Sequence, residues 1–327
     1  MYFIALPVKV NGLGDDAMAA GIGAAGIGTF LCRMAPGLVL AGLFAIPAIA
    51  DNGDDKPKPA FPQVAGGDIF GFTAPTDIGS PGDHGGSIEV DGNLGKRDGR
   101  YQNFTQKYGY ERVFAENWSL GVAFFTAWHG VRNVTVAPIN RSMFQFDGAS
   151  FEIGHRLIER SATNPFAFKI ALEPRWARLD DGGRHSEAFG AELKFITDAV
   201  IVPEKLYWAG NLVLAYDNAR NPEIKSKWQP SSEVKVSQAL TIQVAETFLI
   251  GAEATYLAAF DGGAFNKFTG HAVFLGPTIY WKIADKVSLN ATVAPQIAGR
   301  NIATPGQKMD LDNYTRMMTR FKLSVEF

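Results

Sequence analysis

Cysteine is nearly absent from this sequence, which holds one, Cys32, among 327 residues. Because Cys32 lies in a segment that we expect to be removed, a disulfide framework, a cysteine metal site and a thiol nucleophile are excluded. Excess charge is also lacking: 31 basic and 33 acidic residues leave a net charge of -2, so nothing indicates binding to nucleic acid. Mean hydropathy is close to zero, which is too polar for a helical membrane protein and ordinary for a soluble domain or a transmembrane barrel.

The first fifty residues differ in composition from the rest. In "CRMAPGLVLAGLFAIPAIADNGDD", Arg33 precedes an apolar run over 35–47, and Ala48-Ile49-Ala50 is followed by acidic residues. This order is typical of a secretory signal peptide, so we predict a signal peptide over 1–50, cleavage after Ala50, and export. Met34 or another internal methionine is an alternative start. The glycines of "GIGAAGIG" match a dinucleotide fingerprint in spacing, but no strand precedes them and no βαβ pattern follows, which favours leader sequence.

Residues 51–85 are rich in proline, glycine and aspartate and keep no helical or strand period. We predict an irregular periplasmic arm, with "DIFGFT" as its one apolar island and a candidate anchor. Two interpretations stay open: a plug or gate at the mouth of a pore, or a charged linker.

No helix of ordinary length is predicted after residue 86, because apolar residues recur at every second position. In one clear example, Phe166, Phe168, Ile170 and Leu172 alternate with polar or small residues. The predicted strands are 86–94, 102–115, 118–130, 143–159, 165–178, 187–201, 205–217, 228–240, 247–260, 271–283, 287–298 and 313–327. The second and fourth predicted strands do not keep a clean alternation, so which of their side chains face lipid and which face the lumen is the least well defined.

Two features separate this pattern from a soluble β-sandwich, which remains a third interpretation. Many segments reach the nine to eleven residues that a tilted transmembrane strand requires. Short turns such as "ENW" and "ADK" also alternate with long loops near 94–101, 131–142, 179–186, 218–227, 261–270 and 299–312. We therefore predict an all-β fold over 86–327: a transmembrane, antiparallel, up-and-down β-barrel of about 12 strands, with short periplasmic turns and longer extracellular loops.

The tryptophans give an independent indication. All six fall at predicted strand ends, beside the short turns (Trp118, Trp208 and Trp281) or beside the long loops (Trp128, Trp176 and Trp228). The ten residues from Trp118 to Trp128 in a tilted strand span about 23 Å along the membrane normal, close to the thickness of an apolar belt. These six and Phe327 are the predicted membrane-interface aromatics.

The sequence ends in "RFKLSVEF", in which Phe321, Leu323, Val325 and Phe327 alternate with polar residues. This ending resembles the last strand of Gram-negative outer-membrane barrel proteins. The resemblance covers roughly 86–327 and implies location in the outer membrane, contact with its lipid, and recognition of the last strand by the barrel-assembly machinery. The pattern is also similar to barrels grouped as transporters, such as the phenol-degradation MetA-pathway family.

If apolar positions face lipid, the alternate positions face the lumen. The cationic and acidic candidates there are nearly balanced, which does not indicate strong charge selectivity. On the last strand, three cations share one face, and either an anion track or pairing with Glu89 and Asp91 of the first strand would explain them. The predicted lumen residues are Lys107, Glu111, Glu152, Arg156, Lys169, Glu173, Arg175, Glu192, Lys194, Glu233, Lys235, Glu253, Lys282, Arg316, Arg320 and Lys322.

Enzymatic function is not indicated. No serine with a recognisable context accompanies the histidines, a G-x-S-x-G elbow is absent, and no acidic loop has calcium-site spacing. We predict no catalytic residue, no metal and no cofactor. Two functions remain: a channel or transporter that passes small solutes through a narrow lumen of mixed charge, or a non-conducting barrel held shut by salt bridges. The loop 131–142, "VRNVTVAPINRS", is the predicted inward-folding constriction.

Overall fold

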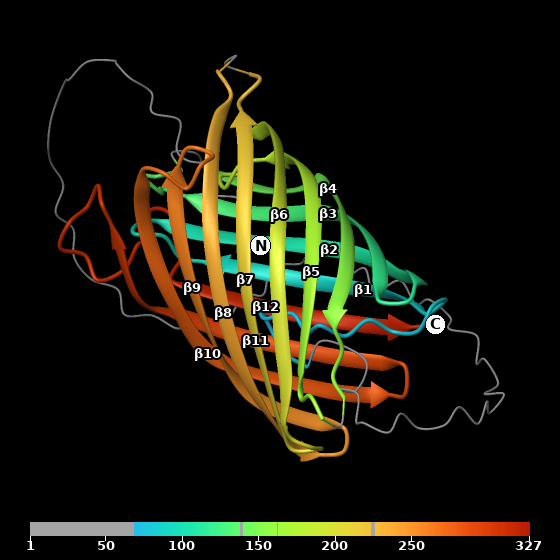
Figure 1. Cartoon of the computed structure of the whole chain (residues 1–327). Helices are drawn as coiled ribbons and strands as arrows, with labels where there is room; N and C mark the ends of the chain where they lie inside the picture. Colours follow the sequence, from blue (N-terminus) through green and yellow to red (C-terminus); the bar gives the residue numbers. More distant parts are fainter. Residues whose placement is uncertain (1–68, 138–139, 162, 224–225) are drawn as a thin grey trace, which may run out of the picture. The chain divides into compact units, whose positions relative to one another are not determined.

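The computed structural model describes residues 69–137, 140–161, 163–223 and 226–327. The predicted signal peptide and most of the predicted arm lie outside these residues. Twelve strands form one closed antiparallel barrel in which each strand pairs with its sequence neighbours and β12 pairs with β1 (Figure 1). The strands are β1 (His84–Leu94), β2 (Arg100–Ala115), β3 (Trp118–Arg132), β4 (Arg141–Ile158), β5 (Phe166–Leu179), β6 (His185–Val202), β7 (Leu206–Arg220), β8 (Gln229–Ala245), β9 (Phe248–Asp261), β10 (Phe268–Ala284), β11 (Val287–Asn301) and β12 (Met317–Glu326). The predicted fold is confirmed.

The last strand closes the barrel. It pairs with β1 over ten residues, from Gly85 opposite Glu326 to Leu94 opposite Met317. The terminal Phe327 adds a backbone hydrogen bond of 3.0 Å to the His84 carbonyl. Because of this closure, neither strand has an unpaired edge, as a sheet in hydrocarbon requires.

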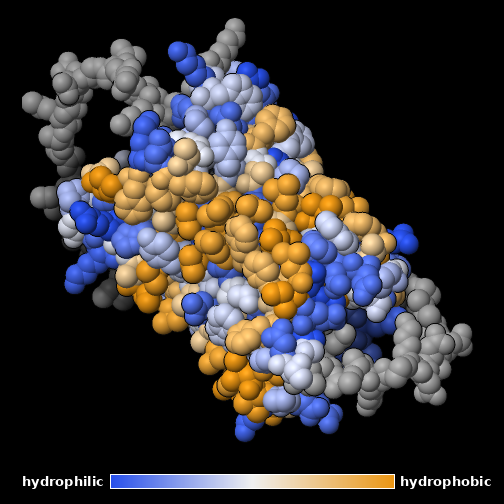
Figure 2. All heavy atoms as spheres, in the orientation of Figure 1, coloured by the Kyte–Doolittle hydropathy of each residue, from blue (hydrophilic) through white to orange (hydrophobic). Residues whose placement is uncertain are grey.

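The two faces of the wall differ sharply. Outward side chains are large and apolar, and their exposed fractions include 60% for Phe144, 55% for Phe189 and 44% for Val293. In Figure 2, hydrophobic residues cover much of the strand surface in view and hydrophilic ones gather toward the ends. A water-soluble protein would not leave so many large apolar side chains uncovered, so this surface faces lipid. Within the described part of the chain, no helix is long and apolar enough to cross a membrane.

Connections at one end of the barrel are mostly shorter than those at the other, with 159–165 as an exception. The short ones include 116–117, 246–247 and 285–286, and Asn117 adopts the left-handed conformation (φ 63°) that such a turn requires. We call the end of the barrel that carries them the short-turn end, and the opposite end the long-loop end. Both β1 and β12 reach the short-turn end, as an even number of strands dictates.

The irregular fourth strand has a local cause. Opposite Phe125 and Thr126 of β3, the register of β4 shifts between Gly148 and Phe146, leaving Asp147 as an extra residue. A bulge of this kind moves the alternation by one position. Asp147 and Glu152 both face the lumen although their numbers differ in parity, which is why the sequence pattern was ambiguous there.

The six tryptophans lie at the two ends of the strands. Trp118, Trp208 and Trp281 are near the short turns, and Trp128, Trp176 and Trp228 are near the long loops. Their contact with the lipid interface stays a prediction.

An arginine placed in the middle of the lipid-facing surface tests the orientation of the wall. Val293 lies at the centre of β11 and points outward, so Val293→Arg is expected to cost about 2–4 kcal/mol of folding free energy, because a charge there must be desolvated. Denaturant unfolding in lipid vesicles measures this cost, with Val293→Leu as the control. Equal stability of the two variants would contradict the assignment of this face to lipid.

Candidate functional site

The inside of the barrel is occupied by a stretch of chain that precedes β1. We call residues 69–83 the lumen segment. Its first residues, Ile69 and Phe70, are 1% exposed and pack with Tyr207, Leu249 and Tyr280 in the half near the short turns. The segment then turns back, and the backbone of Gly82 and Asp83 pairs with Val113 at the short-turn end of β2. The described segment therefore begins in the short-turn half of the lumen and ends at the short-turn mouth.

At its apex the lumen segment is held by one carboxylate. Glu253, on the inner face of β9, accepts hydrogen bonds from the backbone N–H groups of Gly71, Phe72 (2.7 Å) and Thr73 (3.1 Å), and from the Thr73 hydroxyl at 3.3 Å. Consecutive N–H groups that converge on one point form a concave anion site. Here the wall supplies the anion.

Glycine is required at position 71 for this approach. A Cβ atom at Gly71 would lie 1.8 Å from the Thr292 hydroxyl oxygen and 2.8 Å from a Glu253 carboxylate oxygen. Any larger residue would push the apex away from the wall.

Other wall side chains bind the backbone of the same segment. The Asn290 amide donates to the Phe70 carbonyl at 2.7 Å, and the Lys235 ammonium donates to the Phe72 carbonyl at 3.0 Å. The Asn211 amide, oriented to satisfy both of its atoms, accepts from the Ala74 N–H at 2.6 Å and donates to the Ala74 carbonyl at 3.0 Å. The wall therefore supplies the partners that the buried backbone of an irregular segment needs.

Ion pairs fix the returning part of the segment. Arg160, in the turn after β4, binds both Asp77 of the segment and Asp198 of the wall. Asp198 also accepts from the Thr76 N–H at 2.6 Å, and Arg156 donates to the Ile78 carbonyl at 3.3 Å.

A second cluster joins the segment to the closing seam. The Arg320 guanidinium of β12 binds Asp91 at 2.7 and 2.8 Å and Glu89 at 3.0 Å, both on β1. It also donates to the Gly71 carbonyl at 3.3 Å and lies 5.0 Å from the Phe72 ring centroid. Pairing of the last strand with Glu89 and Asp91, one of the two explanations for its cationic face, is the one found.

A third cluster lies on the inner face of the wall from β2 to β6. Lys194 binds Glu152 at 2.6 Å, Glu173, and Glu192 at 3.6 Å. Lys107 joins this group through Glu173 at 3.2 Å. These groups come from β2, β4, β5 and β6 and tie the wall together across the lumen.

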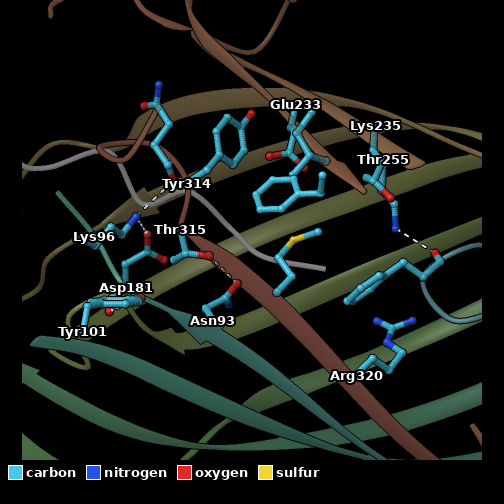
Figure 3. Close-up of a pocket in the computed structure, with 15 residues that line it drawn as sticks. Asn93, Lys96, Tyr101, Asp181, Glu233, Lys235, Thr255, Tyr314, Thr315 and Arg320 are labelled. Carbon is cyan, nitrogen blue, oxygen red and sulfur yellow. Dashed lines mark hydrogen bonds and ion pairs between the residues drawn. The ribbon is translucent and has the colours of Figure 1, made fainter. Parts of the chain in front are cut away.

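Beyond the apex lies a cavity, shown in Figure 3, which we call the central cavity. It contains about 620 Å³ of unfilled space, part of it open to solvent. Phe72 of the lumen segment lines it, and so do residues 313–315, from the connection between β11 and β12. Glu233 and Lys235 line one side, and Lys96, Tyr101 and Asp181 lie across from them in the view.

Asp181, in the loop after β5, also lines this cavity, and the pKa of its carboxyl group is raised. Lys96 lies 4.0 Å from Asp181. Although Asp181 keeps some contact with solvent, burial raises the pKa of its carboxyl to about 7, and the Lys96 ammonium opposes that rise. Lys96 itself donates to the Asp312 and Asn313 carbonyls at 3.2 and 3.3 Å, which holds the connection before β12 in place.

A model described as a family of unknown function (DUF6662) matches residues 62–327. The chain belongs to this family. The match includes the lumen segment as well as the whole barrel. No curated protein sequence matches the chain.

Solved structures of outer-membrane barrels are similar to the chain. The COG4313 outer membrane channel from Pseudomonas putida F1 superimposes with a TM-score of 0.51 at 10% identity, over 77% of this chain and 98% of that one. The translocator domain of the autotransporter NalP from Neisseria meningitidis gives 0.43 at 14% identity, over 77% and 91%. The KdgM porin in complex with disordered oligogalacturonate gives 0.41 at 9% identity, over 74% and 99%. At such identities the likeness is one of fold: the chain has the closed β-barrel fold of these outer-membrane proteins. Kinship with the MetA-pathway family stays a prediction.

Most of the predicted lumen residues lie on inward-facing strand positions. Beyond the clusters above, Arg175 pairs with Asp147 at 3.2 Å, Lys169 is buried on β5, Lys282 pairs with Asp285 at 3.2 Å near the short-turn end, and Lys322 follows Arg320 on β12. Glu111 lies on the same face of β2 as Lys107 and is exposed near the mouth. One residue is placed differently from the prediction: Arg316 precedes β12, where its exposed side chain donates to the Lys96 carbonyl at 3.3 Å. The three-cation face therefore reduces to Arg320 and Lys322.

The inward-folding constriction predicted for the loop 131–142 stays a prediction. In the described part of 131–142, Val134 and Ala137 are buried against Tyr101 at the long-loop end, and no described residue of this loop lines the central cavity. Tyr314 and Thr315, from the connection before β12, do line it. Polar and charged residues made this connection read as an exposed loop, and their buried hydrogen bonds, such as those of Asp310 with Asn301 and Asn313, are not visible in a linear pattern.

Several wall residues that hold the lumen segment were not predicted. Asp198, Asn211 and Asn290 are polar residues at inward positions, which is the only signal they give. Arg160 was read as part of a turn, and Gly71 as part of the apolar island "DIFGFT".

The Arg320 cluster predicts a large loss of stability when its cation is removed. Arg320→Met leaves Glu89 and Asp91 without their counter-charge in the lumen, which is expected to cost about 3–5 kcal/mol of folding free energy. The matched control carries Glu89→Gln and Asp91→Asn as well, and is expected to be the more stable of the two. Denaturant unfolding compares them, and a triple variant no more stable than the single one would contradict a charge-based cause.

The raised pKa of Asp181 predicts a dependence of stability on pH. The folded protein holds this proton up to about pH 7, whereas the unfolded chain releases it near its ordinary pKa of 3.8, so its contribution to stability is lost as pH rises through this window. Asp181→Asn lacks the titration. Its stability relative to the unmodified protein, measured by unfolding at pH 4.5 and pH 8, is expected to be higher at pH 8, and a pH-independent difference would contradict the assignment.

Proposed function

We propose that this protein is an outer-membrane channel for small solutes, and that the lumen segment closes it in the state described here. The observation that carries the proposal is the way the segment is bound. Wall side chains hold its backbone through single hydrogen bonds and a few ion pairs, and it does not add a strand to the sheet. Such contacts can be broken one at a time without opening the barrel, as a movable plug requires.

The charges of the lumen support a channel for small polar solutes. Cations and carboxylates alternate around the wall and around the central cavity, so water and charged groups would be accommodated once the segment moves. Passive diffusion through this narrow, mixed-charge path is the mechanism we propose. The short-turn end would face the periplasm, and the C-terminal strand would be recognised by the barrel-assembly machinery.

One observation favours the alternative, a non-conducting barrel. The cluster of Lys107, Lys194, Glu152, Glu173 and Glu192 spans four strands and would hold the lumen shut if it were rigid. In that case the role of the protein would lie in its loops. The two functions differ in whether displacement of the segment opens a path.

Substitution of Gly71 tests whether the protein is a channel or a non-conducting barrel. In Gly71→Ala the new methyl group would overlap the Thr292 hydroxyl and Glu253, so the apex is expected to leave the wall and conductance in a planar bilayer to rise about tenfold or more over the unmodified protein. Gly121→Ala is the matched control, because a Cβ atom there has its nearest contact at 3.6 Å. Folding of both variants is verified by the change in gel mobility on heating.

The alternative predicts a different result. If Gly71→Ala folds normally and conducts no more than Gly121→Ala, displacement of the apex does not open a path and the channel proposal fails.

A further inference from the structure

We propose that the central cavity binds the carboxylate of a small solute at Lys235, and that this binding releases the lumen segment. The inference rests on the proposed channel function and adds a class of solute and a means of opening. The class is a monocarboxylate with a short apolar body.

Lys235 differs from the other cations of the lumen clusters in its partners. Arg320 has two carboxylates and Lys194 has three within 4 Å, whereas none of the ion pairs between described residues includes Lys235. The hydrogen bond of its ammonium group goes to the Phe72 carbonyl at 3.0 Å, drawn as a dashed line in Figure 3. An ammonium group has three donors, and this contact uses one of them.

The carboxylates around Lys235 are already engaged. Its charge interacts with those of Glu192, Glu253 and Asp91. Glu253 receives the backbone N–H groups of the segment, Glu192 lies 3.6 Å from Lys194, and Asp91 is bound by Arg320. Glu233 lies two residues away on the same face. Its carboxyl group also interacts electrostatically with Lys235, but the two form no ion pair within 4 Å among the described residues. A cation left in this way in a water-accessible cavity is a site for an anion from outside.

The remaining walls define the rest of the ligand. Phe72, Leu257, Phe274 and Met318 line the same cavity and belong to one apolar cluster. A carboxylate at Lys235 would therefore place an attached alkyl group against apolar side chains. A doubly charged anion would have no second free cation beside it among these lining residues, because Arg320 is neutralised by β1.

Binding of the solute and opening of the channel are linked through the ammonium group of Lys235. The same Lys235 ammonium that would receive the solute holds the Phe72 carbonyl at the apex of the segment. A carboxylate is the stronger acceptor for the ammonium group, because its full negative charge attracts the cation more strongly than the dipole of a neutral carbonyl does. A bound carboxylate would draw Lys235 from the Phe72 carbonyl, so the solute binds the released state better and shifts the population toward it.

The experiment compares two probes of equal shape. The protein, purified from outer membranes, is placed in a planar bilayer in dilute KCl at neutral pH, and open probability is measured with sodium butyrate or with butyramide. Butyrate is expected to raise open probability about tenfold and butyramide to have no such effect. Sodium chloride added at the same concentration as butyrate controls for ionic strength.

Two variants assign the effect to Lys235. Lys235→Met keeps most of the length of the side chain but not its charge, so basal opening is expected to rise and the response to butyrate to disappear. Glu233→Gln, on the same strand and in the same cavity, is expected to keep the response. Folding is again verified by gel mobility.

The outcomes separate this inference from the channel proposal. If Gly71→Ala conducts but butyrate and butyramide act alike on the unmodified protein, or if Lys235→Met still responds to butyrate, the inference is wrong and the channel stands. If Gly71→Ala does not conduct, the channel proposal itself fails, and with it the inference.

Discussion

A single requirement runs through this structure: every buried backbone N–H and C=O group must find a partner. In the lipid-facing wall it is met by closing the sheet, so that β12 pairs with β1 and no edge remains. Inside the barrel the same requirement falls on an irregular segment that cannot pair as a strand. There it is met by side chains of the wall, with Glu253, Asn211 and Asn290 acting as substitutes for a neighbouring strand. The candidate functional site is built from these wall side chains.

The second organising feature is the balance of charge within the lumen. Arg320 is neutralised by two carboxylates from the first strand, and the Lys107–Lys194 group contains three glutamates. Buried charges left without partners are costly, so such groups fix the wall and add little to selectivity. Selectivity is instead expected where the pairing is incomplete, which in the central cavity is at Lys235.

Much of the wall was predictable from the sequence, because a period of two is imposed directly on the order of residues. Phe166 to Trp176 in β5 alternate as the sequence indicates, and the lengths of the turns gave the number of strands correctly. The bulge at Asp147 reverses the alternation in β4. The sequence shows this as a break in the period, but it does not show which residue bulges. The contents of the lumen were much less predictable. Contacts such as that of Gly71 with Glu253 join residues 182 positions apart, and neither the inward-folding connection before β12 nor the binding of backbone by Asn211 leaves a periodic signal.

The position of the lumen segment has a consequence for assembly. It immediately precedes β1, yet it is held by side chains of β7, β8, β9, β11 and β12. The wall that receives the segment is complete only after β12 has paired with β1. The full set of contacts that holds the segment therefore requires the closed barrel, although the segment is a neighbour in sequence of only one of the strands that bind or close around it.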